Sequence, residues 1–192
     1  MTRLHAFPEE HGRGPVRAYN AGWGGLPDGE ASLTRVLVRA GFRPFYRELH
    51  VTCEGERFPP PLAPAPRGLG AVRVEVGPTR GVQRETEIRL LRGGEELGNC
   101  IHSTLGNLTD HPDAARWGYI HWLGTAAPVR RRGVARHLLT RALHDLAAQG
   151  CTGCWLTTGA ANWEAQPLYL SLDFEIVDTS ACYVRPLSAP TA

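Results

Sequence analysis

Hydrophobic and polar residues follow β-strand patterns from residue 71 onward. Val72, Val74 and Val76 alternate with polar residues, as in a half-exposed strand. Two later strand-like runs are joined by Arg92-Gly93-Gly94-Glu95, a sequence typical of a hairpin turn. A polar loop precedes a further run that is rich in β-branched and aromatic residues. The strands predicted in this part are 72–76, 82–91, 96–105 and 117–125, with the loop at 107–116.

Helical spacing begins after the last of these strands. Between Gly133 and Gln149 the apolar residues recur every three or four positions, and Gly150 is a suitable helix stop. We then expect a strand at 154–158, a helix at 161–172 and an extended segment at 174–184. A hairpin followed by strand, helix, strand, helix and strand predicts an α/β fold with at least one parallel crossover.

A proline-rich segment interrupts these patterns upstream, with five prolines in the eight positions 59–66. Proline joins neither helix interiors nor central strands, so we expect an extended linker over residues 56–70. This linker would separate an N-terminal segment, residues 1–55, from a C-terminal domain, residues 71–192.

Composition limits the class of protein. The chain has 192 residues, of which 42% are hydrophobic and 21% charged, so it can bury a real core. No run approaches the ~18 apolar residues of a membrane helix and no secretory leader is seen, so we expect a soluble, cytoplasmic protein that binds no membrane. All 21 basic residues are arginine, which reflects either GC-rich codons or selection for phosphate contact. A net charge of +2 argues against a general polyanion binder.

Cysteine spacing points to neither a disulfide framework nor a metal site. The five cysteines are an odd number, and Cys151-Thr-Gly-Cys154 lacks the second pair that a four-ligand zinc site requires. We therefore expect no metal.

The segment between the strand at 117–125 and the helix after Gly133 carries the most chemical information. Three arginines and then small residues open the helix, where first-turn N–H groups have no partners within the helix. With the helix dipole, such an end is an anion site. It is not a GxxxxGK[ST] phosphate loop, because the lysine and the hydroxyl are absent.

Two motifs in this region resemble those of the GCN5-related N-acetyltransferase (GNAT) superfamily. Arg130-Arg131-Arg132-Gly133-Val134-Ala135 matches Arg/Gln-x-x-Gly-x-Gly/Ala, the loop that binds acetyl-CoA in that superfamily. After the next strand, Asn162-Trp163-Glu164-Ala165-Gln166-Pro167-Leu168-Tyr169 resembles its Asn-x-x-Ala-x-x-Leu-Tyr helix. Leu172-Asp173-Phe174 resembles the following Gly-Phe turn, with Asp173 in place of glycine.

The resemblance implies the acyl-CoA N-acyltransferase fold, a mixed and mostly antiparallel sheet with a splayed central pair of strands and flanking helices. It implies acetyl transfer from acetyl-CoA to a primary amine by direct attack on the thioester. Backbone amides from Arg131 to Arg136 would hold the pyrophosphate, and Leu123 and Thr125 would pair with the pantetheine arm and polarise the thioester carbonyl. The cofactor-binding residues so implied are Leu123, Thr125, Arg130, Arg131, Arg132, Gly133, Val134, Ala135, Arg136 and Asn162.

Two residues are candidates for proton transfer. Tyr169 stands where the superfamily often places a general acid for the leaving thiolate, although a tyrosine packed in the core would fit the same pattern. His121 is a candidate general base, because a strand period places it on one face with Tyr119, Leu123 and Thr125. A half-buried histidine bonded to a neighbour is the alternative reading. Weaker candidates are Glu85, Glu87, His102 and a water chain.

The N-terminal segment departs from the superfamily pattern. Residues 77–81 are too few for the two helices that normally follow the first strand and shape the acceptor site. Residues 33–52 read as helix, Gly-Phe turn and strand, like a second copy of 167–177 with Val36 at the tyrosine position. We therefore expect residues 1–55 to be a degenerate, partial first copy of the domain. Its unpaired strand would need a partner in the C-terminal domain or in another chain, so we expect a homodimer.

Two other functions remain open at this stage. Missing acceptor helices would also suit a non-catalytic acetyl-CoA-binding or scaffold module. Nucleic-acid binding through Arg130, Arg131 and Arg132 ranks last, because no aromatic residues interleave with these arginines. The acceptor amine belongs to a small molecule or a protein.

Overall fold

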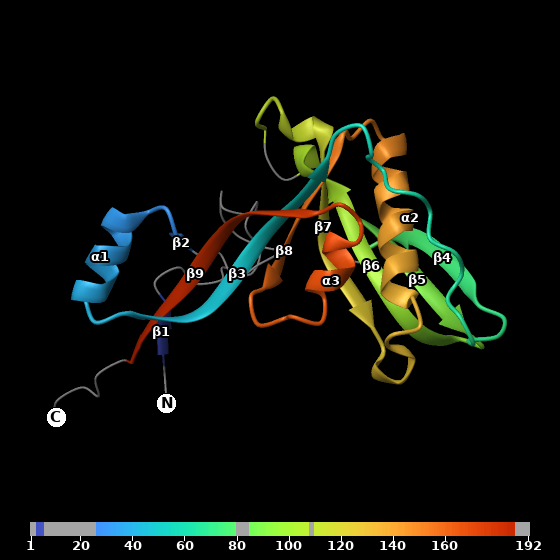
Figure 1. The fold of residues 1–192 in the computed structure, drawn as a ribbon, viewed down its shortest axis with the longest axis horizontal. Helices are drawn as coiled ribbons and strands as arrows, with labels where there is room; N and C mark the ends of the chain where they lie inside the picture. Colours follow the sequence, from blue (N-terminus) through green and yellow to red (C-terminus); the bar gives the residue numbers. More distant parts are fainter. Residues whose placement is uncertain (1–2, 6–25, 80–84, 108–109, 187–192) are drawn as a thin grey trace. The chain divides into compact units, whose positions relative to one another are not determined.

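The computed structural model describes residues 3–5, 26–79, 85–107 and 110–186 (Figure 1). Contacts group the chain into two units. Unit 1 comprises Met1–Val51, Thr157–Pro167 and Ile176–Ala192, and unit 2 comprises Thr52–Leu156 and Leu168–Glu175. Strands β3 (Arg43–Glu54), β8 (Gly153–Gly159) and β9 (Glu175–Pro186) each run from one unit into the other.

Unit 2 contains a meander of four antiparallel strands followed by a parallel crossover. The strands β4 (Arg73–Pro78), β5 (Thr86–Arg92), β6 (Glu95–Thr104) and β7 (Trp117–Thr125) pair in that order, and β8 pairs with β7 in parallel. Helix α2 (Val134–Ala148) makes the crossover and covers one face of β5, β6 and β7 (Figure 1). Short 3-10 turns lie at Leu105–Asn107, Ala114–Arg116 and Ala127–Val129. The mixed, mostly antiparallel fold is confirmed.

The core of unit 2 lies between α2 and the sheet. Six apolar residues of α2 are buried: Val134, Leu138, Leu139, Ala142, Leu143 and Leu146. Each larger side chain among them contributes about 1.5–3 kcal/mol relative to an exposed position. Glycines in the sheet let the helix approach, because a Cβ on Gly118 would lie 2.5 Å from Leu146 Cδ1.

A β-bulge in β7 overturns one sequence prediction. Ile101 of β6 pairs with Trp122, but the next residue, His102, pairs with Ile120, so His121 is an extra residue. Leu123 and Thr125 consequently lie on the face that α2 covers, whereas His121 accompanies Tyr119 on the opposite face, with ring centroids 6.2 Å apart. The expectation that all four share one face is wrong, because an uninterrupted period of two does not survive an inserted residue.

Unit 1 contains strands β1 (Arg3–His5) and β2 (Leu26–Pro27), both antiparallel to β9, and helix α1 (Ala31–Arg39). Strand β3 pairs with β9 in this unit. A small core of Leu26, Ala181 and Tyr183 is covered by Leu37 and Phe42. The N-terminal strand that was expected to be unpaired therefore has a partner within the chain, and the homodimer stays a prediction.

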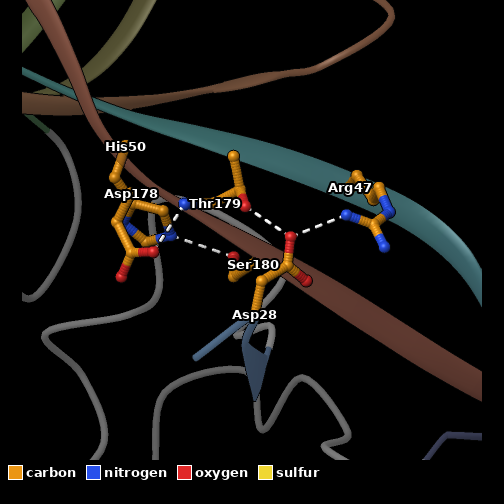
Figure 2. Close-up of polar contacts among 6 residues, drawn as sticks. All are labelled: Asp28, Arg47, His50, Asp178, Thr179 and Ser180. Carbon is orange, nitrogen blue, oxygen red and sulfur yellow. Dashed lines mark hydrogen bonds and ion pairs between the residues drawn. The ribbon is translucent and has the colours of Figure 1, made fainter. Parts of the chain in front are cut away.

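Polar contacts connect β2, β3 and β9 (Figure 2). The Asp28 carboxylate accepts hydrogen bonds from Arg47, at 2.6 Å, and from the Thr179 hydroxyl. Beside them His50 Nε2 is 2.9 Å from Ser180 Oγ, and burial lowers the pKa of His50. Ser180 is almost completely buried, so this pair stabilises the strand pairing rather than facing solvent.

The closing helix of the domain is shorter than predicted. Helix α3 spans Gln166–Leu170 instead of 161–172, because Asn162 and Ala165 donate backbone hydrogen bonds to Gly159 and Asn162 in successive turns. Pro167 lies in the first turn of α3, where its missing N–H costs nothing.

The two helix–turn–strand segments compared above, residues 33–52 and 167–177, have the same hydrogen-bond pattern at the turn. Phe174 N donates to Tyr169 O and Asp173 N to Leu170 O, as Phe42 N donates to Leu37 O and Gly41 N to Val38 O. The turn residues Asp173 and Gly41 are both left-handed, with φ of 60° and 81°. This register places Leu37, not Val36, at the position equivalent to Tyr169.

The proline-rich residues 56–70 lie in unit 2 and are hydrogen-bonded to α2 rather than extending away from it. Residues 1–2, 6–25, 80–84, 108–109 and 187–192 lie outside the described residues, so the predictions that fall on them are not compared with the structure. These include the start of the predicted strand 82–91 and much of the proposed N-terminal copy.

Candidate functional site

The site begins where β7 separates from β8. The two strands pair from Trp117–Gly153 to Ile120–Leu156, and β7 then continues to Thr125. Beyond Ile120, the ladder of β7 within unit 2 is with β6 alone, so Leu123 and Thr125 present backbone groups on their other side. Thr125 Oγ1 is buried without a hydrogen-bond partner among the described residues, which fits a position that a polar ligand completes.

The loop after β7 leads directly into the N-terminus of α2. Arg131 and Gly133 both adopt left-handed backbone conformations, with φ of 63° and 89°. For arginine such a conformation is strained and persists only where the surrounding structure imposes it. Among the described residues no side chain caps α2, so the amides of its first turn lie unpaired at the positive end of the helix dipole. The loop therefore has the geometry of an anion site.

The four arginines around this loop have different surroundings. Arg130 and Arg131 are exposed, and their guanidinium groups are available to an anion. Arg132 Nη1 instead donates to Gly68 O at 3.1 Å, and Arg136 donates to the Ser171 hydroxyl. Val134 is buried in the core, so only its backbone amide can serve a ligand.

A histidine and a carboxylate meet on the face of the sheet opposite α2. His121 Nδ1 lies 2.5 Å from Oε1 of Glu85, the residue that precedes β5. The Glu85 side chain is 7% exposed and that of His121 is 34% exposed, so the imidazole is the solvent-facing member. The carboxylate accepts the Nδ1 proton, which leaves the Nε2 lone pair free to take up a proton. The sequence supplied both residues as separate candidates, but the bulge and the strand register bring them together.

A second polar chain lies on the same face. Trp122 Nε1 donates to Asn99 Oδ1 at 3.0 Å, and Asn99 Nδ2 donates to Glu87 Oε1 at 2.9 Å. The Trp122 side chain remains 56% exposed. An exposed indole beside carboxylates attracts a cation. Sequence reasoning missed Asn99 and Trp122, because neither belongs to a recognisable motif.

Tyr169 lies on α3, buried, with its ring packed edge-on against Phe174 at 5.9 Å between centroids. The hydrogen bond from Arg136 to Ser171 ties the segment that carries Tyr169 to the first turn of α2. Asn162 belongs to unit 1, where its Nδ2 donates to Thr158 Oγ1 at 3.2 Å.

The weaker base candidate His102 lies on the other face of the sheet, under α2. It is completely buried with Nε2 2.6 Å from Asp145 Oδ2, and burial lowers its pKa despite that carboxylate. His102 and His121 therefore do not belong to one site.

In the parts of the chain that the structure describes, no group of three or more histidine, cysteine, aspartate or glutamate side chains could hold a metal ion. The five cysteines are buried free thiols, and burial raises the pKa of Cys53 to about 11. No described helix has the length and apolar character needed to cross a membrane.

Comparison with known proteins agrees with this geometry. Residues 89–174 match the model of the acetyltransferase (GNAT) family. N-alpha-acetyltransferase MAK3 of Arabidopsis thaliana is 35% identical over 77 residues, which are 40% of this chain and 40% of that protein. N-alpha-acetyltransferase 30 of Xenopus laevis is 32% identical over 81 residues, 42% of this chain and 29% of that protein. The chain thus matches less than half the length of either relative.

Solved structures show the same fold. A tandem GNAT protein from the clavulanic acid biosynthesis pathway superposes with a TM-score of 0.64 at 13% identity, over 85% of this chain and 63% of the other. A GCN5-related N-acetyltransferase from Sphaerobacter thermophilus superposes with a TM-score of 0.62 at 16% identity, over 84% and 58%. Residues 89–174 therefore resemble the acetyltransferase (GNAT) family, and the chain has the fold of the GCN5-related N-acetyltransferases.

Proposed function

We propose that this chain transfers an acetyl group from acetyl-CoA to a primary amine. The observation that carries the proposal is the loop from Arg130 to Gly133, strained at Arg131, which opens an uncapped helix at the end of the splayed strand β7. A diphosphate is the anion that such a helix end binds through several backbone amides at once. The His121–Glu85 pair on the same strand then supplies proton chemistry.

The residues present suit acetyl-CoA. Amides from Arg131 to Arg136 would hold the diphosphate, with Arg130 and Arg131 as additional charge. The backbones of Leu123 and Thr125 would pair with the pantetheine arm, and Asn162 would contact it. Bound acetyl-CoA supplies a thioester carbonyl that an amine can attack.

Proton transfer follows from the orientation of the His121 ring. An ammonium group must lose a proton before its nitrogen can attack, and Nε2 of His121 accepts that proton while Glu85 holds Nδ1. Positive charge on the imidazole is then balanced by the buried carboxylate. Tyr169 would donate its hydroxyl proton to the leaving thiolate.

The acceptor class follows from the face that carries His121. Glu87 and the exposed indole of Trp122, joined through Asn99, form a surface suited to a cationic amine, and the buried Glu85 carboxylate adds negative charge behind His121. Since the curated relatives are named N-alpha-acetyltransferases, a protein N-terminal α-amine is the acceptor that we favour over a small-molecule amine.

The test is release of free CoA thiol from acetyl-CoA in the presence of a panel of short peptides and small amines. We expect His121→Ala and Tyr169→Phe each to lower kcat by about 10²–10⁴-fold while the Kd for acetyl-CoA changes less than about twofold. His111→Ala, which removes a solvent-exposed histidine, is the matched control and should retain wild-type turnover. Full turnover in His121→Ala would remove His121 as the base.

A non-catalytic acetyl-CoA-binding module is the second candidate. It is favoured by the short connection, residues 79–85, between β4 and β5, which has no room for a pair of acceptor-site helices. Tight acetyl-CoA binding by the wild type, with no thiol release for any acceptor, would select this candidate.

We also propose that residues 1–55 are a degenerate copy of the domain at 71–192. Support comes from the matching hydrogen-bond patterns at Phe42 and Phe174 and from the left-handed residue before each. The copy lacks a residue that could act as Tyr169 does, because Leu37 stands in its place.

A further inference from the structure

The proline-rich segment follows α2 through hydrogen bonds from one face of the helix. His144 Nε2 donates to Pro60 O at 2.9 Å, and Thr140 Oγ1 accepts from Ala63 N at 3.1 Å. His137 Nδ1 donates to Pro64 O at 3.0 Å and to Ala63 O at 3.2 Å. The spacing of His137, Thr140 and His144 places them in one stripe along the helix. The segment is therefore docked along its length.

The charge state of His137 supports the same docking. Its Nε2 accepts a hydrogen bond from Arg141 Nε at 2.9 Å, so the proton must be on Nδ1, which faces the two carbonyls. The imidazole is fixed as one neutral tautomer by groups on both sides. Thr140 is completely buried, and its hydroxyl accepts from Ala63 N in the segment and donates to Arg136 O in the helix.

The end of the segment reaches the anion-binding loop. Arg67 N donates to Arg132 O at 3.1 Å, and Arg132 Nη1 donates back to Gly68 O at 3.1 Å. Gly68 has φ of +67°, a conformation that favours glycine. Arg132 is thus held through both its main chain and its side chain, between the left-handed residues Arg131 and Gly133.

We propose that residues 60–68 are a positioning element for the diphosphate-binding loop. By fixing Arg132, the segment keeps Arg131 and Gly133 in left-handed conformations, so that the loop amides stay directed outward before ligand arrives. The segment raises affinity for acetyl-CoA without touching it, and the guanidinium group and carbonyl of Arg132 contact this segment rather than the ligand. The inference rests on the proposed function, since it concerns the same loop.

The test compares Arg67→Pro with Arg67→Ala. Proline removes the N–H that reaches Arg132, whereas alanine removes only the guanidinium group. Losing one hydrogen bond predicts that Arg67→Pro raises the Kd for acetyl-CoA roughly three- to tenfold. Arg67→Ala should stay within about twofold of wild type. For S-acetylpantetheine, which lacks the diphosphate, both variants should bind like wild type. Calorimetric titration measures each Kd.

A second pair of variants keeps the test valid if Arg67→Pro fails to fold. Thr140→Val removes the acceptor for Ala63 N at nearly constant volume, and Thr140→Ser keeps it, so only the valine variant should weaken acetyl-CoA binding. Equal Kd values within each pair, or equal weakening for acetyl-CoA and S-acetylpantetheine, would overturn the positioning role. If the wild type fails to bind acetyl-CoA, the proposed function is rejected and the inference with it.

Discussion

At the scale of single residues, two histidines on neighbouring strands have opposite surroundings. His121 is the extra residue of a bulge and faces solvent with its Nδ1 on Glu85. His102 is enclosed under α2, and its Nδ1 is buried without a hydrogen-bond partner among the residues that the structure describes. The first is the proposed base, whereas the second, enclosed under α2, has no access to a substrate.

His102 predicts a loss of stability in acid. Burial lowers its folded-state pKa, while Asp145 and Glu85 oppose this more weakly. The unfolded chain therefore binds the proton first, at about pH 6.5. The contribution of neutral His102 to the free energy of unfolding is fully present above that pH. It is lost as the pH falls through the folded-state pKa. The free energy of unfolding of the wild type, measured in urea, should fall between pH 8 and pH 5. His102→Gln should reduce this fall. The exposed-site control His111→Gln should fall like the wild type, and an unchanged slope in His102→Gln would contradict the prediction.

At the scale of elements, the distance between α2 and the sheet depends on glycines in β6 and β7. A Cβ on Gly98 would lie 2.6 Å from Gly124 O and 2.9 Å from Val134 Cγ1, so both β7 and the first turn of α2 would have to move. Gly124 lies between the two residues proposed to contact pantetheine, Leu123 and Thr125. Packing at this point therefore also positions the site.

Gly98→Ala should lower the free energy of unfolding by about 1–3 kcal/mol, as expected for overpacking against backbone. It should also weaken acetyl-CoA binding. Gly77→Ala, with no atom of the described residues within 4 Å of the added Cβ, is the matched control and should change stability by less than about 0.5 kcal/mol. Urea denaturation measures both. Equal stabilities would mean that the sheet and helix adjust without cost.

At the scale of the whole molecule, strands β3, β8 and β9 pass between the two units, so neither is a separable stretch of sequence. The pairing of β3 with β9 also means that the N-terminal strand needs no second chain.

Acetyl-CoA should stabilise the full chain against thermal unfolding. At 100 times its Kd the expected gain is ~2.7 kcal/mol, which raises Tm in proportion. ATP, a phosphate-rich nucleotide without pantetheine, is the control and should give a much smaller shift. No shift with millimolar acetyl-CoA would contradict both the enzyme and the binding-module proposals.

Much of the fold follows from local sequence. Residues 117–125 were predicted as a strand and form β7 at the same bounds, because β-branched and aromatic residues dominate there. The stripe after Gly133 gives α2, and the Arg-x-x-Gly-x-Ala motif correctly indicates where its N-terminus would be exposed. Helix α3 is shorter than predicted, since turn hydrogen bonds at residues 159–165 replace its first half.

What the sequence determined by itself is therefore the order and type of most elements and the motifs that resemble those of the GNAT superfamily, because propensity, periodicity and turn residues act over a few neighbours. Only the tertiary structure decided which face carries His121, that Glu85 is its partner, that β3 pairs with β9, and that the prolines at 59–66 lie along α2. The physical reason is that an inserted residue, a strand partner and a docked segment are set by hydrogen bonds between distant positions. Such bonds leave no period in the local pattern.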